Sequence, residues 1–150
     1  MTVSADVRRV ALFVALAVIV TARAASAQRF FSTGVSDKEV LGWFDRLQKA
    51  VAGNQRSVVA GMVEYPLRVN HGPKVHESIV GRTELLRQYD AVFSPPIRRA
   101  IVDQKPADLF ANADGIAVGH GAVWLKSVCT RRAPISCHLG VHDINLPATP

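Results

Sequence analysis

The two cysteines of the chain lie only eight residues apart, in the stretch CTRRAPISC from Cys129 to Cys137. An even cysteine count favours a disulfide in an exported protein, and this spacing differs from the Cys-x-x-Cys of redox proteins. Pro134 and the polar residues around it indicate a turn between the cysteines. A disulfide across so short a loop strongly constrains the fold, because it places the two cysteines at the facing ends of two strands.

A zinc site built from Cys129, Cys137, His138 and His142 is the alternative use of these cysteines. The spacing matches no common structural zinc pattern, and two histidines four residues apart on one strand are separated by roughly 13 Å. We therefore expect a disulfide, and we expect neither a metal ion nor a cofactor.

The first 27 residues have the pattern of a secretory signal peptide. Arg8 and Arg9 precede an uninterrupted apolar run, residues 10–20, and small residues precede the junction of Ala27 with Gln28. This run is shorter than the ~20 residues that span a bilayer as a helix, which disfavours the alternative of an uncleaved anchor. We expect cleavage between Ala27 and Gln28, export to a bacterial periplasm or to the medium, and no stable membrane anchor.

The expected mature chain, residues 28–150, is long enough for one compact core and too short for two. Removal of the leader leaves 15 basic and 11 acidic side chains, a net charge of +4. The basic residues are scattered, whereas nucleic-acid-binding proteins concentrate them in a stripe. We therefore expect a solvated basic surface and no nucleic-acid partner.

Helical and strand periodicities alternate along the mature chain. Ser36 and Glu39 form the pattern of a capping box, followed by apolar residues at helical spacing up to Gly53. After a loose leader at 28–35, we expect further elements in the following order. These are a short helix at 56–63, a hairpin at 64–80, a helix capped by Thr83, a helix from Ser94 to Val102, a strand ending in an Asn-Ala-Asp-Gly turn, a long strand at 116–126, a last strand at 138–145 and a frayed tail at 147–150.

This order resembles that of the nuclear transport factor 2-like superfamily, with its SnoaL-like and ketosteroid isomerase-like branches. Three stretches carry the resemblance: WFDRLQKAVAGNQRSVVAGMV, GRTELLRQYDAVF and NADGIAVGHGAVWL. The resemblance covers residues 36–146. It implies an α+β fold, in which a cone-shaped curved antiparallel sheet packs against N-terminal and central helices around a pocket. It also implies pairing of two copies through the sheet. No stretch matches the catalytic pattern of an enzyme branch.

His120 is the most suggestive single residue, because it stands between two glycines in an apolar run. If residues 116–126 form one strand, His120 shares a face with Val118 and Trp124. The simplest interpretation is a partly buried histidine bonded to one neighbour. The alternative is a histidine that orients a ligand against Trp124, with a hydroxyl from Tyr65 and a carboxylate from Asp103. The glycines do not match a nucleotide-binding loop.

Two classes of function remain open from the sequence. The first is a non-catalytic domain that binds a small apolar ligand or a protein partner, with Tyr65, His120 and Trp124 as ligand-binding residues. The second is a small hydratase or isomerase that acts on an apolar substrate in the cone pocket, with His120 as the base and Asp103 as its acidic partner. The enzyme requires these side chains to converge, and an interior filled by aromatic residues would exclude it.

Overall fold

The computed structural model describes residues 29–148, and the fold and the candidate site are those of that part of the chain. The expected signal peptide, its cleavage site at Ala27 and Gln28, and the last two residues of the tail lie outside the described range. Within it, no helix combines the length and the apolar character that crossing a membrane requires.

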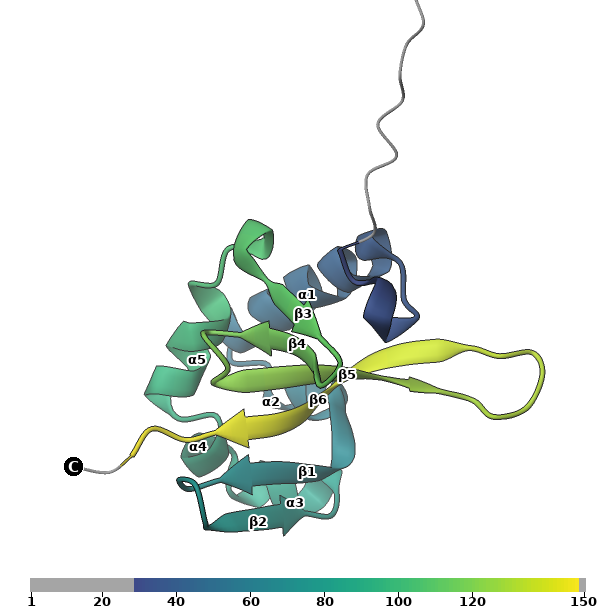
Figure 1. Ribbon diagram of the computed structural model, residues 1–150. Coiled ribbons are helices and arrows are strands. Elements are labelled where there is room, and N and C mark those ends of the chain that lie inside the picture. The colour runs from purple at the N-terminus through teal and green to yellow at the C-terminus, as the bar shows by residue number, and fades with distance from the viewer. Residues whose placement is uncertain (1–28, 149–150) are drawn as a thin grey trace, which may run out of the picture.

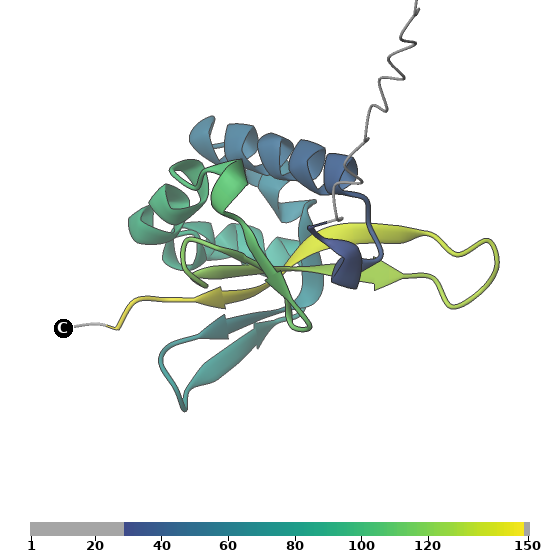
Figure 2. The same ribbon diagram turned by 45° about the horizontal axis from the view of Figure 1, so that its top comes forward.

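The fold is α+β, as expected, with the helices gathered on one face of a mixed six-stranded sheet (Figures 1 and 2). The strand order is β2-β1-β6-β5-β4-β3, so β2 and β3 form two free edges and the sheet is open. The helical elements are η1 (Phe31–Thr33), α1 (Asp37–Ala52), α2 (Arg56–Ala60), α3 (Arg82–Arg87), α4 (Tyr89–Val92), α5 (Pro95–Val102) and η2 (Pro106–Asp108). The strands are β1 (Val63–Asn70), β2 (His76–Ile79), β3 (Phe110–Asn112), β4 (Gly115–Val118), β5 (Val123–Cys129) and β6 (Cys137–Asn145).

Helix α1 begins where its sequence predicts. The Ser36 hydroxyl accepts a hydrogen bond from the Glu39 amide at 3.3 Å, and the Glu39 carboxylate accepts from the Ser36 amide at 3.1 Å. This reciprocal pair satisfies two amides that the first turn leaves without a helical partner. The buried face of the helix consists of Val40, Phe44, Leu47, Ala50 and Val51.

The central helices follow the prediction less closely. Thr83 does not cap α3, because this helix begins at Arg82 with Gly81 as its N-cap. The carboxylate of Glu84 instead accepts a hydrogen bond from the amide of Val80 at 2.9 Å, just before the helix. Helix α5 starts at Pro95 directly after Ser94, as the proline predicts.

The expectation of an antiparallel sheet is wrong at one pairing. Strands β1 and β6 run parallel, with Val63 opposite Val141 and Val69 opposite Ile144, whereas all other neighbours are antiparallel. Strands β3, β4, β5 and β6 are neighbours in that order, and each runs antiparallel to the one before it. The last of them, β6, then lies beside β1. The pairing of the first strand with the last is determined by tertiary packing, and local sequence patterns do not predict it.

The leader expected to be loose at 28–35 is packed against the domain from residue 29 onwards. Phe30 is fully buried, and the Asp37 carboxylate accepts hydrogen bonds from the amides of Arg29 and Phe30 at 3.0 and 3.1 Å. The Arg29 guanidinium donates to the main-chain carbonyls of Ala107 and Leu109. The contacts of the Arg29 guanidinium join segments 78 and 80 residues apart, so no local pattern in residues 29–35 could predict them.

Side chains fill the space between the sheet and the helices, where the resemblance implied a ligand pocket. Phe44 and Phe93 are fully buried there, whereas Trp43 and Trp124 remain partly exposed. The largest side chains that are fully buried are those of Tyr89, Phe30, Phe44, Phe93, Leu47, Leu67, Ile79, Leu85, Ile97, Ile101, Ile116 and Leu125.

Candidate functional site

His120 lies in a turn and not in a strand, which corrects the expectation of one long strand at 116–126. The turn joins β4 to β5, and Val118 pairs directly with Val123 across it. The backbone φ of His120 is +56°, between Gly119 at +58° and Gly121 at +89°. Glycine adopts this left-handed region most readily, so Gly-His-Gly is a turn sequence. The apolar residues on both sides of it led to the prediction of one continuous strand.

Because of this turn, His120 and Trp124 do not share one face of a strand, contrary to the prediction. Core-facing positions of the hairpin are Ile116, Val118, Val123 and Leu125, all fully buried. Trp124 lies on the opposite face of the sheet, paired with Ala117 and Asp143. There it borders a shallow polar hollow in which Lys126 and Asp143 form an ion pair at 3.3 Å. His120 and Trp124 therefore do not form one site.

His120 and Asp103 do line one cleft, as the enzyme alternative required. The cleft has a volume of about 640 Å³ and lies between α5, the segment after it, and the β3–β4 hairpin. Gln104 fixes this turn, because its side-chain oxygen accepts a hydrogen bond from the Gly119 amide at 2.8 Å. No local pattern predicted Gln104 as a residue of the cleft. The same holds for the other polar and aromatic residues that line it, which are Arg99, Lys105, Asp108 and Phe110.

Tyr65 lies outside this cleft. Its hydroxyl donates a hydrogen bond to the main-chain carbonyl of Ala60 at 2.9 Å. Burial raises the pKa of the Tyr65 hydroxyl above its ordinary value, which keeps the group protonated. The three side chains of the expected acid–base set thus do not converge on one point.

The disulfide between Cys129 and Cys137 is present, as expected, at the facing ends of β5 and β6. Its formation removes both thiols from the alternative zinc site. His138 pairs instead with Glu64 at 3.1 Å, and His142 pairs with Asp143 at 2.7 Å.

The disulfide closes a loop that projects from the molecule (Figures 1 and 2). We call residues 127–139 the arm. Three hydrogen bonds cross it beyond the disulfide: the Thr130 amide donates to the Ser136 carbonyl at 2.8 Å, the Ser136 amide donates to the Thr130 hydroxyl at 3.0 Å, and the Thr130 hydroxyl donates to the Pro134 carbonyl at 3.2 Å. Residues 129–136 are exposed throughout, and the Ile135 side chain is 74% exposed.

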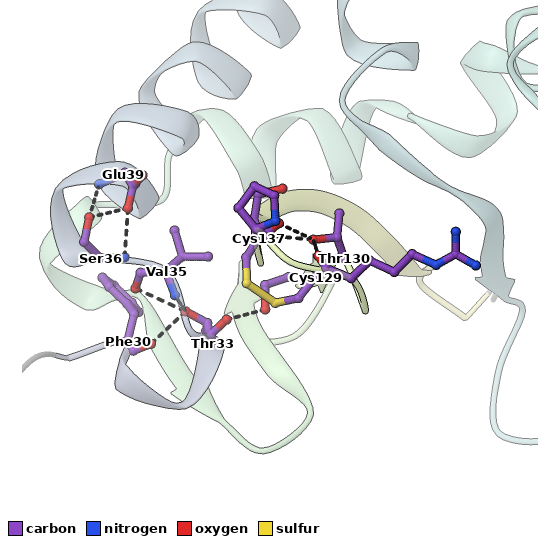
Figure 3. Close-up of a disulfide and its surroundings, with 12 residues drawn as sticks. Phe30, Thr33, Val35, Ser36, Glu39, Cys129, Thr130 and Cys137 are labelled. Atoms are coloured by element: carbon purple, nitrogen blue, oxygen red, sulfur yellow. Dashed lines mark hydrogen bonds between the residues drawn. A yellow bond between two sulfur atoms is a disulfide. The ribbon is translucent and has the colours of Figure 1, made fainter.

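The base of the arm rests on the N-terminal segment (Figure 3). The Ser127 hydroxyl donates a hydrogen bond to the main-chain carbonyl of Thr33. The Thr33 hydroxyl in turn donates to the carbonyl of Phe30 at 2.7 Å, which links the arm to a fully buried side chain. The base of the arm is therefore held against η1.

The sequence indicated the disulfide and the turn, but it did not point to the arm as a site. The feature that could have indicated it is the pair Arg131 and Arg132, which lies with one isoleucine between the two cysteines. Within residues 29–148, neither arginine takes part in an ion pair.

Comparison with family models, with curated proteins and with solved structures gives no match to this chain.

Proposed function

We propose that this chain is an exported, non-catalytic domain that binds another protein, and that the arm makes the contact. The observation that carries the proposal is the chemistry of the arm: two unpaired arginines and an isoleucine that is 74% exposed, all on a loop closed by a disulfide. Arginine is enriched at protein interfaces, and burial of an exposed apolar side chain such as that of Ile135 in a partner is favourable. A loop that is already ordered loses little conformational entropy when it binds.

Two further parts of the proposal have indirect support. Export is supported by the signal-peptide pattern of residues 1–27 and by the disulfide, since such bonds persist in oxidising compartments. Membership of the nuclear transport factor 2-like superfamily, with a cone-like curvature of the sheet, is supported by the order of the elements and by the helices on one face of the sheet.

The test is site-directed photo-cross-linking in the compartment to which the chain is exported. A photoreactive residue at Ile135 should give one discrete adduct, and excess unlabelled wild-type protein should abolish it. Excess of a variant with Arg131→Glu, Arg132→Glu and Ile135→Asp should leave it intact. The matched control is the same photoreactive residue at Val58 of α2, which is 50% exposed and should give no such adduct. Equal adducts at both positions, or none at Ile135, would refute the proposal.

A second candidate is a small-ligand site or a hydratase-like enzyme in the cleft beside α5. It is favoured by one observation, that His120 and Asp103 line the same cleft of about 640 Å³. The volume suits a drug-sized molecule. Native mass spectrometry of the exported protein should then show a bound molecule that is lost on His120→Ala and retained on His76→Ala, since His76 is exposed on β2. An empty protein in both cases would end this candidate.

A further inference from the structure

We propose that the arm is an inhibitory loop for a serine protease that cleaves after basic residues, and that Arg131 enters the specificity pocket of the protease. This inference rests on the proposed function and names the class of partner. It follows from three properties of the arm: an accessible basic side chain, a backbone fixed before binding, and one peptide bond whose two sides stay tethered.

The side chain of Arg131 matches the pocket of such a protease in charge. Proteases of the trypsin type carry an aspartate at the floor of that pocket. A guanidinium binds a carboxylate through two parallel charge-assisted hydrogen bonds. No acidic residue lies between Cys129 and Cys137 to compete for Arg131, and the residues from Cys129 to Ser136 are exposed. The arm projects beyond the rest of the molecule (Figures 1 and 2). Its tip can therefore enter the active-site cleft of a protease without a clash between the protease and the body of the domain.

The backbone around Arg131 is fixed by its neighbour Thr130. This residue exchanges hydrogen bonds with Ser136 through its amide, at 2.8 Å, and its hydroxyl, at 3.0 Å. One residue before it, the disulfide joins the two strands. Protease–inhibitor complexes are among those in which the partners change little on binding, and such rigidity raises affinity by lowering the entropy lost.

The hydrogen bonds distinguish Arg131 from Arg132 as the residue that is attacked. The carbonyl of Arg132 lies 3.4 Å from the Thr130 hydroxyl, which turns it towards the inside of the loop. The carbonyl of Arg131 accepts no hydrogen bond from any residue in the described range, so it is free to enter an oxyanion hole. The bond presented to the protease is therefore the peptide bond between Arg131 and Arg132.

The same tethers make the loop an inhibitor and not a good substrate. The serine oxygen of the protease adds to the Arg131 carbonyl carbon, and the serine proton passes through the protease histidine to the Arg132 nitrogen as the C–N bond breaks. The products are an ester between Arg131 and the serine, and a free amine on Arg132. That amine stays in place, because the disulfide and the Thr130–Ser136 pair hold both sides of the loop. It re-adds to the ester and passes its proton through the protease histidine to the serine oxygen, which leaves as the hydroxyl. The peptide bond is thus restored faster than water hydrolyses the ester.

The experiment measures the inhibition of trypsin by the purified, disulfide-bonded protein, with a chromogenic arginine substrate. We expect competitive inhibition that weakens at least 100-fold for Arg131→Ala and less than 10-fold for the matched control Arg132→Ala, since the specificity pocket dominates such complexes. Arg131→Phe should lose trypsin and gain inhibition of chymotrypsin, whose pocket is apolar. Thr130→Val, which keeps the shape of the side chain, should weaken inhibition about 10-fold and increase cleavage.

A variant without the disulfide tests the tether itself. The double substitution Cys129→Ser with Cys137→Ser should convert the inhibitor into a substrate, and mass spectrometry should locate the cut after Arg131. The bridge lies outside the hydrophobic core, so circular dichroism should report a folded body for this variant.

Three results would overturn the inference. They are the absence of inhibition at about 100 µM, a concentration that captures even weak complexes, inhibition that survives Arg131→Ala, and rapid complete cleavage of the disulfide-bonded arm. If trypsin is not inhibited but the competed adduct at Ile135 still forms, the inference fails and the proposed function stands. If that adduct is absent too, both fail.

Discussion

The side chain of Ser127 donates a hydrogen bond to the main-chain carbonyl of Thr33, 94 residues earlier in the chain. This contact joins the base of the arm to the segment that precedes α1. Because Thr33 also bonds to the carbonyl of the buried Phe30, the orientation of the arm depends on the packing of the N-terminal segment.

Replacement of Phe30 tests whether the N-terminal segment belongs to the folded unit. Phe30→Ala should lower the free energy of unfolding by about 3–5 kcal/mol, because it empties a fully buried site. Urea unfolding measures the loss. The matched control is Phe110→Ala, which removes the same atoms from a side chain that is 60% exposed and should change stability by less than about 0.5 kcal/mol. Similar losses in both variants would contradict the packing of residues 29–35.

Gly119 should not tolerate a side chain. A Cβ there would lie 2.5 Å from the Cβ of Ala100 in α5, and the backbone φ is +58°. Gly119→Ala should therefore destabilise the protein by about 2–4 kcal/mol, from backbone strain together with overpacking. Thermal unfolding would show this loss, and Ala100→Gly in the same chain should restore part of it. Gly72→Ala, which has a φ of +114° and open space, reports strain without the clash.

Gly42 should respond in the opposite direction. It lies inside α1, and a Cβ there would come no closer than 4.0 Å to the Arg46 guanidinium. Gly42→Ala should raise the free energy of unfolding by about 0.8–1 kcal/mol, because alanine has the higher helix propensity. A loss of stability on urea unfolding would show that this part of α1 is packed more closely than the structure has it.

The capping box should make stability depend on pH. Hydrogen bonds from Ser36 lower the pKa of Glu39 below its ordinary value, so the folded state favours the charged carboxylate. This contribution is present above the unfolded pKa and is lost as the pH falls through the folded one. The urea midpoint of the wild type should exceed that of Glu39→Ala at pH 7, and the difference should narrow towards pH 3. In a Ser36→Ala background, which removes the side-chain hydrogen bond that lowers the pKa of Glu39 most, the same comparison should narrow less.

The sequence could predict the parts of the fold that depend on neighbouring residues. Ser36 and Glu39 predicted the start of α1, and Pro95 predicted the start of α5. The eight-residue spacing of the cysteines predicted the disulfide. The hairpin of β1 and β2 and the Asn-Ala-Asp-Gly turn from Asn112 to Gly115 were also predicted correctly. In each case the physical cause lies within a few residues of its effect.

Predictions failed where a distant contact decides. The parallel pairing of β1 with β6 and the anchoring of Arg29 to the Leu109 carbonyl depend on segments more than 70 residues away. His120 was wrongly assigned to a strand, because the apolar residues on both sides outweighed the turn signal of Gly119 and Gly121. As a result, Trp124 and Tyr65 were grouped with a histidine whose cleft they do not line.

The proposed role of the arm requires that its backbone is ordered before any partner binds. Amide hydrogen exchange of the free protein, followed by NMR, measures this at two positions. The amides of Thr130 and Ser136 should be protected, because each donates across the loop, and protection at Ser136 should fall when Thr130 is replaced by valine. If both amides exchange as fast as those of an unfolded peptide, the arm is not preorganised and its role as a rigid contact element is contradicted.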